Sequence, residues 1–277
     1  MIFWALIKGT IKEALSKKIL LSVFGLFSFI VLLILALINL DSVEGIPALM
    51  QANEEFDYRQ FIISIELLMI SQPPFLIIMT LFMVMVSSFI PSMLEKGNIE
   101  VLLSKPVSRT SIILSKYLAG VIIIFFALLY LVLLIWIIVS AKSGVWHFDF
   151  VIYSVIYYTY IFAVMYSAII LTGLLFRSTI LSLIVNIMLF FPITAILSLK
   201  NEMAQVITNK PVMFIIDFIY YLLPKPWDIR AIASSLIEGS FTATGGFFFA
   251  YQPVITSGIF MVAMLFLSIY FFNKKDY

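Results

Sequence analysis

The stretch YLAGVIIIFFALLYLVLLIWIIVSA, which runs from Tyr117 to Ala141, contains no Asp, Glu, Lys or Arg. It is longer than the roughly 20 apolar residues that a helix needs to cross about 30 Å of hydrocarbon. Because lipid offers the backbone no hydrogen-bond partners, such a stretch must form a helix that satisfies its own amide groups. Five more uncharged stretches occupy Ile19–Leu40, Leu67–Leu94, Phe150–Phe176, Ser178–Leu199 and Gly239–Asn273. The sequence therefore predicts an all-α integral membrane protein with six transmembrane helices.

The composition of the chain indicates the same class. Of its 277 residues, 63% are hydrophobic and 12% are charged, and the mean hydropathy is +1.15. These values lie outside the range of soluble globular domains. We expect one membrane domain over residues 1–277, with an outer loop over 200–252 that contains short helices, one of them near Val212–Leu223. The spans are expected at about 19–40, 73–94, 112–140, 150–176, 178–199 and 253–273.

The first 18 residues carry a helical pattern of their own. Apolar side chains recur every four residues, and charged side chains fall elsewhere on the helix: Phe3, Ile7, Ile11 and Leu15 against Lys8, Lys12, Glu13 and Lys17. This pattern is typical of an amphipathic helix that lies in the headgroup layer with its lysines toward anionic lipid. The alternative is that the first span simply starts early.

Basic residues indicate how the spans are oriented. Short cytoplasmic loops are enriched in Lys and Arg. Alternate segments outside the predicted spans, beginning with the N-terminal one, hold eleven basic residues against six in the others. We therefore expect a multi-pass protein of the cytoplasmic membrane, with both the N-terminus and the C-terminus in the cytoplasm.

The turn over residues 95–109 has the most specific pattern. Gly97 weakens the helix that leaves the membrane, since glycine is costly inside helices. Ile99, Leu102 and Leu103 follow at helical spacing and form one apolar stripe, and Pro106 ends the segment. A short cytoplasmic helix of this kind needs an apolar surface against which its stripe can be buried. A groove on a partner and the surface of the bilayer are both compatible with the pattern.

Polar side chains inside the predicted spans are few. Tyr157 and Tyr160 lie on one face of the fourth span, and Asn186 lies in the middle of the fifth. They are candidates for lining a translocation path, although packing and helix–helix hydrogen bonds are the commoner roles of such residues.

The turn also resembles that of a known family. The run Glu95-Lys96-Gly97, followed by Leu102-Leu103-Ser104, Pro106, Arg109 and Lys116, is similar to the signature turn of ABC-2 type transporter permeases. The length of the chain, its basic start and its acidic first outer loop resemble that family as well. Leu222–Asp228, with the sequence LLPKPWD, and Glu238-Gly239-Ser240 are similar to the last outer loop of the copper-processing permeases of nitrous oxide reductase maturation.

This resemblance implies a half-transporter, an exporter driven by a separate ABC ATPase. Two permease chains, identical or different, would pair in the membrane, and residues 95–109 of each would dock on an ATPase subunit. The residues that the resemblance assigns to this coupling are Glu95, Gly97, Ile99, Leu102, Leu103, Pro106 and Arg109. The chain has no GxxxxGK[ST] phosphate loop, so ATP and Mg²⁺ are expected on the partner and no cofactor on this chain.

The sequence argues against several other classes. A secondary transporter or channel normally places ionisable side chains in the middle of its spans, and the six uncharged stretches contain no Asp, Glu, Lys, Arg or His. Intramembrane enzymes and metal sites need several His, Cys or Asp ligands, but the chain has one His and no Cys. We therefore expect no catalytic or metal-binding residues, and nothing points to nucleic acid. An ABC-2-like membrane anchor or sensor without transport remains an open alternative.

Overall fold

The fold was analysed in a computed structural model that describes residues 2–16, 22, 24–29, 57–71, 74–104, 106–243 and 246–275. Within these ranges all regular secondary structure is helical. The helices, in chain order, are α1 (Ile2–Ser16), α4 (Tyr58–Ile70), α5 (Pro74–Ser87), α6 (Phe89–Met93), α7 (Asn98–Leu103), α8 (Arg109–Ser143), α9 (Phe148–Phe176), α10 (Thr179–Met188), the π-helix η1 (Leu189–Ile193), α11 (Thr194–Ser198), α12 (Lys200–Val206), α13 (Lys210–Leu222), α14 (Pro226–Glu238), α15 (Phe247–Ala250) and α16 (Gln252–Lys274).

Five helices among the described residues are long and apolar enough to cross a membrane. They cover Pro74–Met93, Arg109–Ser143, Phe148–Phe176, Thr179–Ser198 and Gln252–Lys274. The chain is thus a multi-pass membrane protein. The first predicted span, 19–40, lies mostly outside the described residues, so a total of six spans stays a prediction.

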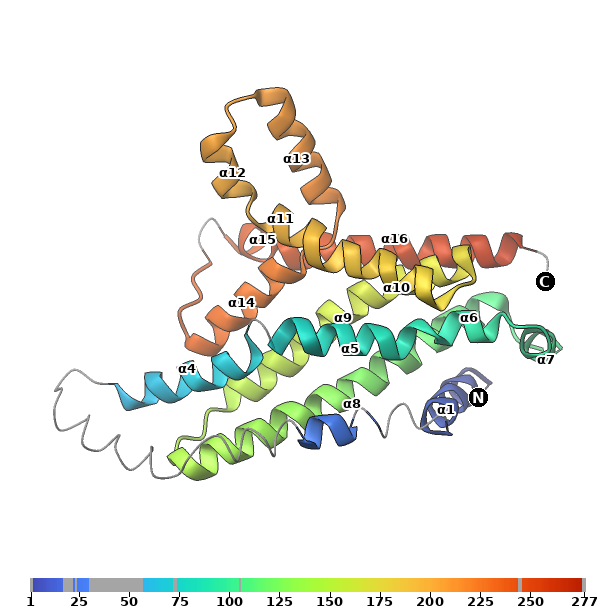
Figure 1. Cartoon of the computed structure of the whole chain (residues 1–277), viewed down its shortest axis with the longest axis horizontal. Coiled ribbons are helices and arrows are strands. Elements are labelled where there is room, and N and C mark those ends of the chain that lie inside the picture. The colour runs from blue at the N-terminus through green and yellow to red at the C-terminus, as the bar shows by residue number, and fades with distance from the viewer. Residues whose placement is uncertain are drawn as a thin grey trace.

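The two longest helices exceed the thickness of the bilayer. α8 has 35 residues, which at 1.5 Å per residue gives a helix of about 52 Å against about 30 Å of hydrocarbon. α8 and α9 run side by side in Figure 1, and α4 and α14 pack on the end of α9 that extends past the other spans. The bundle therefore has an extension at one end. At the other end lie α1, α7 and the end of α16 (Figure 1); we call this the turn end.

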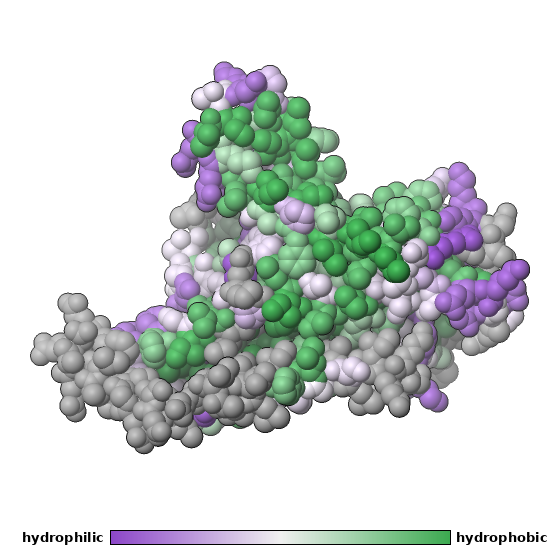
Figure 2. All heavy atoms as spheres, in the orientation of Figure 1, coloured by the Kyte–Doolittle hydropathy of each residue, from purple (hydrophilic) through white to green (hydrophobic). Residues whose placement is uncertain are grey.

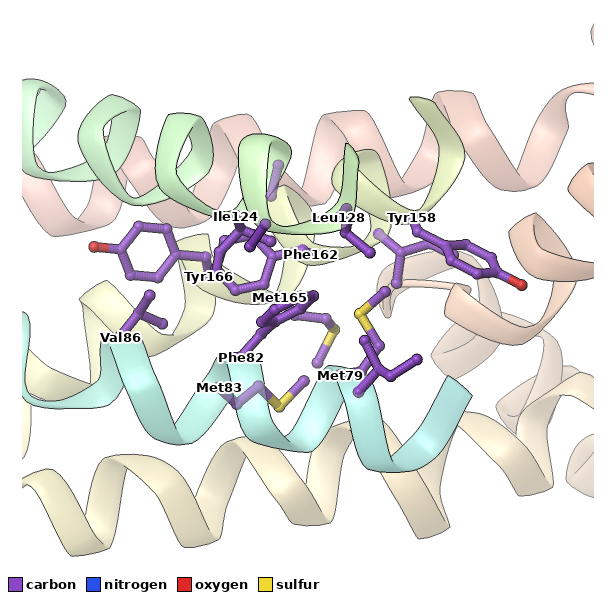
Figure 3. Packing of buried hydrophobic residues seen from close by; sticks show 14 of the residues in the cluster. Met79, Phe82, Met83, Val86, Ile124, Leu128, Tyr158, Phe162, Met165 and Tyr166 are labelled. Carbon is purple, nitrogen blue, oxygen red and sulfur yellow. The ribbon is translucent and has the colours of Figure 1, made fainter. Parts of the chain in front are cut away.

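The core is formed around α9. Figure 3 shows Met79, Phe82 and Met83 of α5 directed toward Phe162 and Met165 of α9. Each of these five side chains is at most 1% exposed. Methionine is a flexible apolar side chain that fills irregular gaps. In this fold Met79 and Met83 do so between two transmembrane helices.

A glycine allows the closest approach between α8 and α9. A Cβ at Gly120 would overlap Cε1 of Tyr166 and lie 2.7 Å from its Cζ. The Tyr166 ring cannot move away easily, because it stacks on Phe162 and Tyr117 and its hydroxyl donates to the Lys116 carbonyl at 3.2 Å. Only a residue without a side chain fits here.

The fifth predicted span, 178–199, is interrupted. α10 and α11 are joined by the π-helix η1, which contains Pro192. Proline lacks the amide hydrogen that an α-helix needs and clashes with the preceding turn, so the local widening to a π-helix follows from this residue.

The first part of the predicted outer loop, α12 and α13, forms a separate arm, whereas α14 packs on the bundle. α12 and α13 make a helical hairpin that stands away from the bundle in Figure 1. Figure 2 shows hydrophobic atoms along this hairpin and hydrophilic ones at its tip. The exposed apolar side chains of α13 include Phe214, Ile215, Phe218 and Leu222.

Candidate functional site

The candidate site is the turn end of the bundle, and its entry is set by Gly97. This residue is the N-cap of α7 and has a φ of 90°, a conformation that side-chain-bearing residues rarely adopt. The amides of Asn98 and Ile99 donate to the Glu95 carbonyl at 3.1 and 3.3 Å. The Asn98 side chain donates to the Ser92 carbonyl at 2.9 Å. The chain thus leaves α6, turns sharply and starts α7 across the end of the bundle (Figure 1).

The apolar stripe of α7 faces the chain's own bundle. Ile99 is 5% exposed and belongs to the main hydrophobic core. Leu102 is partly buried against that core and lines a hollow together with residues of α1 and α8. The side chain of Leu103 lies outside the described residues. The sequence alone was compatible with packing of this stripe against a partner's groove or against lipid. In the structure, Ile99 and Leu102 pack against other helices of the same chain.

The opposite face of the turn is polar and exposed. Glu95, Lys96, Asn98 and Glu100 all project from it. Pro106 is also exposed and follows the end of α7. A partner that approaches the turn end therefore meets charged and amide groups, while Ile99 anchors α7 from behind.

The N-terminal helix braces this region. α1 packs along α8 through Ile7 and Thr10, which are 2% and 5% exposed. Glu13 accepts a hydrogen bond from the Lys116 ammonium at 2.9 Å, and the Lys116 side chain is 9% exposed. The predicted interfacial helix thus uses its apolar face mainly against α8, and Trp4, Lys8 and Lys12 point outward.

The α1–α8 brace gives a testable stability effect. In Glu13→Gln, the buried Lys116 ammonium loses its counter-charge. We expect the free energy of unfolding to fall by about 1 kcal/mol, a small effect for a buried charge because the partly exposed Glu13 side chain is screened by solvent. Hydrogen exchange of the α1 amides is expected to speed up accordingly. Lys12→Gln removes an exposed charge from the same helix and serves as the control. Unchanged α1 exchange in Glu13→Gln would contradict the brace.

Arg109 ties the turn to the last helix. Its Nη1 donates to the carbonyls of Phe272, Asn273 and Lys275 at 3.1, 3.3 and 2.7 Å. Its guanidinium carbon lies 6.0 Å from the centre of the Phe272 ring. The last carbonyls of a helix have no intrahelical partner and carry partial negative charge, so the first residue of α8 caps the C-terminus of α16.

A second contact joins the same helix end to α9. The Lys275 ammonium donates to the Leu174 carbonyl at 2.9 Å. Hydrogen bonds therefore connect the ends of α8, α9 and α16 at the turn end.

The three candidate path residues do not meet. Tyr160 donates from its hydroxyl to the Val254 carbonyl of α16 at 2.6 Å. Asn186 is fully buried and donates to Thr172 of α9 at 2.9 Å. Tyr157 is partly exposed on α9. Tyr160 and Asn186 thus hold different helix pairs together, and the lining of a path remains a prediction.

Sequence reasoning missed a buried pair at the extended end. His147 Nδ1 lies 2.9 Å from Oε2 of Glu66, and Glu66 is fully buried. Oε1 of Glu66 has no hydrogen-bond partner among the described residues. Glu66 directly precedes the uncharged stretch Leu67–Leu94, but no signal in the sequence pairs it with His147. Among the described residues, no group of three or more His, Cys, Asp or Glu side chains could hold a metal ion.

Comparison with known proteins assigns the sequence of this chain to a family. The family described as "ABC-2 family transporter protein" matches residues 4–277. No curated protein sequence and no solved structure matches the chain.

Proposed function

Because the chain belongs to the family of ABC-2 transporter proteins, we propose that it is the permease subunit of an exporter driven by a separate ABC ATPase. The single observation that carries this proposal is the turn end. The short helix α7 has an exposed polar face and is anchored from behind by Ile99. It is followed by α8, and Arg109 and Lys275 connect the ends of α8, α16 and α9. A movement of the ATPase that displaces such a helix would also displace the transmembrane helices.

The proposed coupling assigns a role to each predicted residue. Gly97 permits the turn, Ile99 and Leu102 fix α7 to the bundle, and Arg109 links α8 to α16. Glu95 lies on the exposed face toward the ATPase, Pro106 ends the segment, and Leu103 shares the apolar stripe in the sequence. ATP and Mg²⁺ are bound by the ATPase, and closure of the ATPase around them moves α7.

The assembly and its orientation follow from the same proposal. The turn end, with both α1 and the end of α16, faces the cytoplasm of a cytoplasmic membrane, as the distribution of Lys and Arg favours. Two permease chains pair, each with six spans, and each engages an ATPase. The LLPKPWD stretch, where α13 ends and α14 begins, supports a place near the copper-processing subgroup.

A charge reversal on the exposed face tests the proposal. In Glu95→Lys plus Glu100→Lys, complementary contacts across the interface become repulsive. We expect the amount of phosphate-loop ATPase that co-purifies with the tagged chain to fall at least about tenfold. This corresponds to a loss of about 1.4 kcal/mol of binding free energy. Both residues are exposed, so folding and membrane insertion are expected to stay intact.

The matched control reverses two exposed charges elsewhere. Glu202→Lys plus Glu238→Lys lies on α12 and α14, away from the turn end. This control is expected to retain the ATPase. If the wild-type chain itself brings no ATPase from its native membranes, the anchor or sensor alternative is favoured. If Glu95→Lys plus Glu100→Lys retains it fully, α7 is not the docking site.

A further inference from the structure

A groove lies between the end of α13 and α16. It has a volume of about 310 Å³ and is lined almost entirely by apolar side chains: Tyr221, Leu222, Leu223, Thr256, Ile259, Phe260, Ala263 and Met264. This volume lies at the lower end of the roughly 300–1,000 Å³ of small-molecule sites. The side of the groove that α16 forms extends from Thr256 to Met264, about 12 Å at 1.5 Å per residue. One wall is thus a membrane-spanning helix, and the groove runs along it.

One end of the groove is polar and positively charged. The Lys225 ammonium donates to Thr256 Oγ1 at 2.8 Å and to the Leu223 carbonyl at 3.3 Å. Both acceptors belong to residues that line the groove. Lys225 is only 3% exposed, and its backbone amide is held by Ser257 Oγ at 2.9 Å. The ammonium is therefore fixed at the groove's polar end.

The charge of Lys225 lacks a paired carboxylate. None of the ion pairs in the described part of the chain includes this residue. Two acids of this region have other partners, since Asp228 accepts from the Tyr220 hydroxyl at 2.6 Å and Asp217 pairs with Lys200 at 3.5 Å. Lys200 and Lys225 both lie over the Tyr220 ring, at 4.0 and 4.6 Å from its centre. An anion at this end of the groove would complement the Lys225 ammonium.

The surroundings of the groove are apolar. α13 exposes Phe214, Phe218 and Leu222, at 73%, 60% and 59%, beside the groove. Figure 2 shows this hairpin as a hydrophobic surface with a hydrophilic tip. A helix with such a face rests among lipid headgroups and acyl chains. The occupant of the groove therefore comes from the membrane and combines an apolar chain with an anionic head.

We propose that the groove between α13 and α16 is a binding site for one glycerophospholipid, with an acyl chain along Ile259 and Ala263 and the phosphate at Lys225. The lipid belongs to the leaflet opposite the turn end. This site is separate from the proposed ATPase contact and does not depend on it. Bound lipid fixes the α12–α13 arm against α16.

The charge of Lys225 predicts how binding varies with pH. Burial lowers the pKa of Lys225 to about 8, Asp228 partly opposes this shift, and Lys200 adds to it. The protonated ammonium binds the phosphate, so affinity is highest below pH 8 and falls as the pH rises through that value. Other titratable groups lie around Lys225 on α12, α13 and α14: Lys200, Tyr220, Tyr221 and Asp228, with Asp217 paired to Lys200.

Native mass spectrometry of the delipidated full chain, titrated with phosphatidylglycerol, tests the site. We expect one lipid per chain, with the affinity reduced at least about tenfold by Lys225→Gln and by Ala263→Trp, which fills the groove. Diacylglycerol, which has no phosphate, is expected to bind more weakly and to be insensitive to Lys225→Gln. This second probe separates recognition of the head from burial of the acyl chain.

Matched controls and folding checks accompany these variants. Lys210→Gln removes an exposed lysine at the tip of the arm, and Ala141→Trp enlarges an exposed alanine on α8. Both are expected to bind phosphatidylglycerol like the wild type. If Lys225→Gln lowers the melting temperature, the site is judged from Ala263→Trp instead. Ala263 is exposed in the groove, so its replacement is not expected to disturb the core. Wild-type affinity in Ala263→Trp, or a lipid-free dimer that covers α16, would overturn the proposal.

Discussion

Gly120→Val is expected to destabilise the chain by about 3 kcal/mol or more, the largest effect of any single substitution that we predict. A Cβ at this position overlaps Cε1 of Tyr166 and lies 2.9 Å from its hydroxyl oxygen. Overpacking of a dense core costs typically about 1–3 kcal/mol and sometimes more. Valine adds two methyl groups to that Cβ. The change is measured as the melting temperature and the monodisperse fraction of the solubilised protein.

A glycine without neighbours provides the control. A Cβ at Gly9 of α1 meets nothing within 4 Å, so Gly9→Val is expected to leave the melting temperature nearly unchanged. The cause is tested by a double-mutant cycle: Tyr166→Ala is itself destabilising, but Gly120→Val is expected to cost less in that background, because the space that the new side chain needs is free. Equal stability of Gly120→Val and the wild type, or an equal cost of Gly120→Val in the wild-type and Tyr166→Ala backgrounds, would contradict the packing of α8 on α9.

Arg109→Ala is expected to uncouple the last helix from the turn. Three carbonyls at the end of α16 lose their charged donor, and hydrogen bonds to charged groups contribute about 1.5–3 kcal/mol each in favourable settings. We expect exchange of the Phe272–Lys275 amides to rise about tenfold or more. Under the proposed function, the ATPase stays bound but its activity no longer responds to the permease.

Two variants separate the geometry of Arg109 from its charge. Arg109→Lys keeps the positive charge but lacks the planar fork that reaches several carbonyls, so partial rescue is expected. Lys96→Ala removes an exposed charge from the same turn without touching α16. Normal exchange at the end of α16 in Arg109→Ala would show that the cap contributes little. Loss of ATPase binding in that variant would place Arg109 at the interface instead.

The sequence carried enough information for the membrane class of this chain and for five of its spanning helices. Long uncharged stretches leave the backbone few options in lipid. The helix at Asn98–Leu103 followed from Gly97, Pro106 and the spacing between them. The short helix at Lys210–Leu222 was likewise expected from an apolar stretch too short to span.

The partners of individual side chains could not be predicted. Periodicity shows that Ile99 and Leu102 share a face but not whether a partner, lipid or this chain covers that face. Arg109 finds its carbonyl acceptors at the other end of the chain. Glu66 and His147 are joined only once α4 packs beside α8 and α9. Such contacts depend on tertiary packing, which local pattern does not determine.

Site-directed cross-linking at α7 tests the central claim most directly. The sequence contains no cysteine, so Lys96→Cys introduces the one thiol on this chain at an exposed position of the turn. A cysteine-directed photoreactive cross-linker, applied in native membranes, is predicted to join this position to a phosphate-loop ATPase. The same label at Glu238→Cys on α14 is predicted to leave that ATPase free. Capture of the ATPase from α14 and not from α7 would contradict the account.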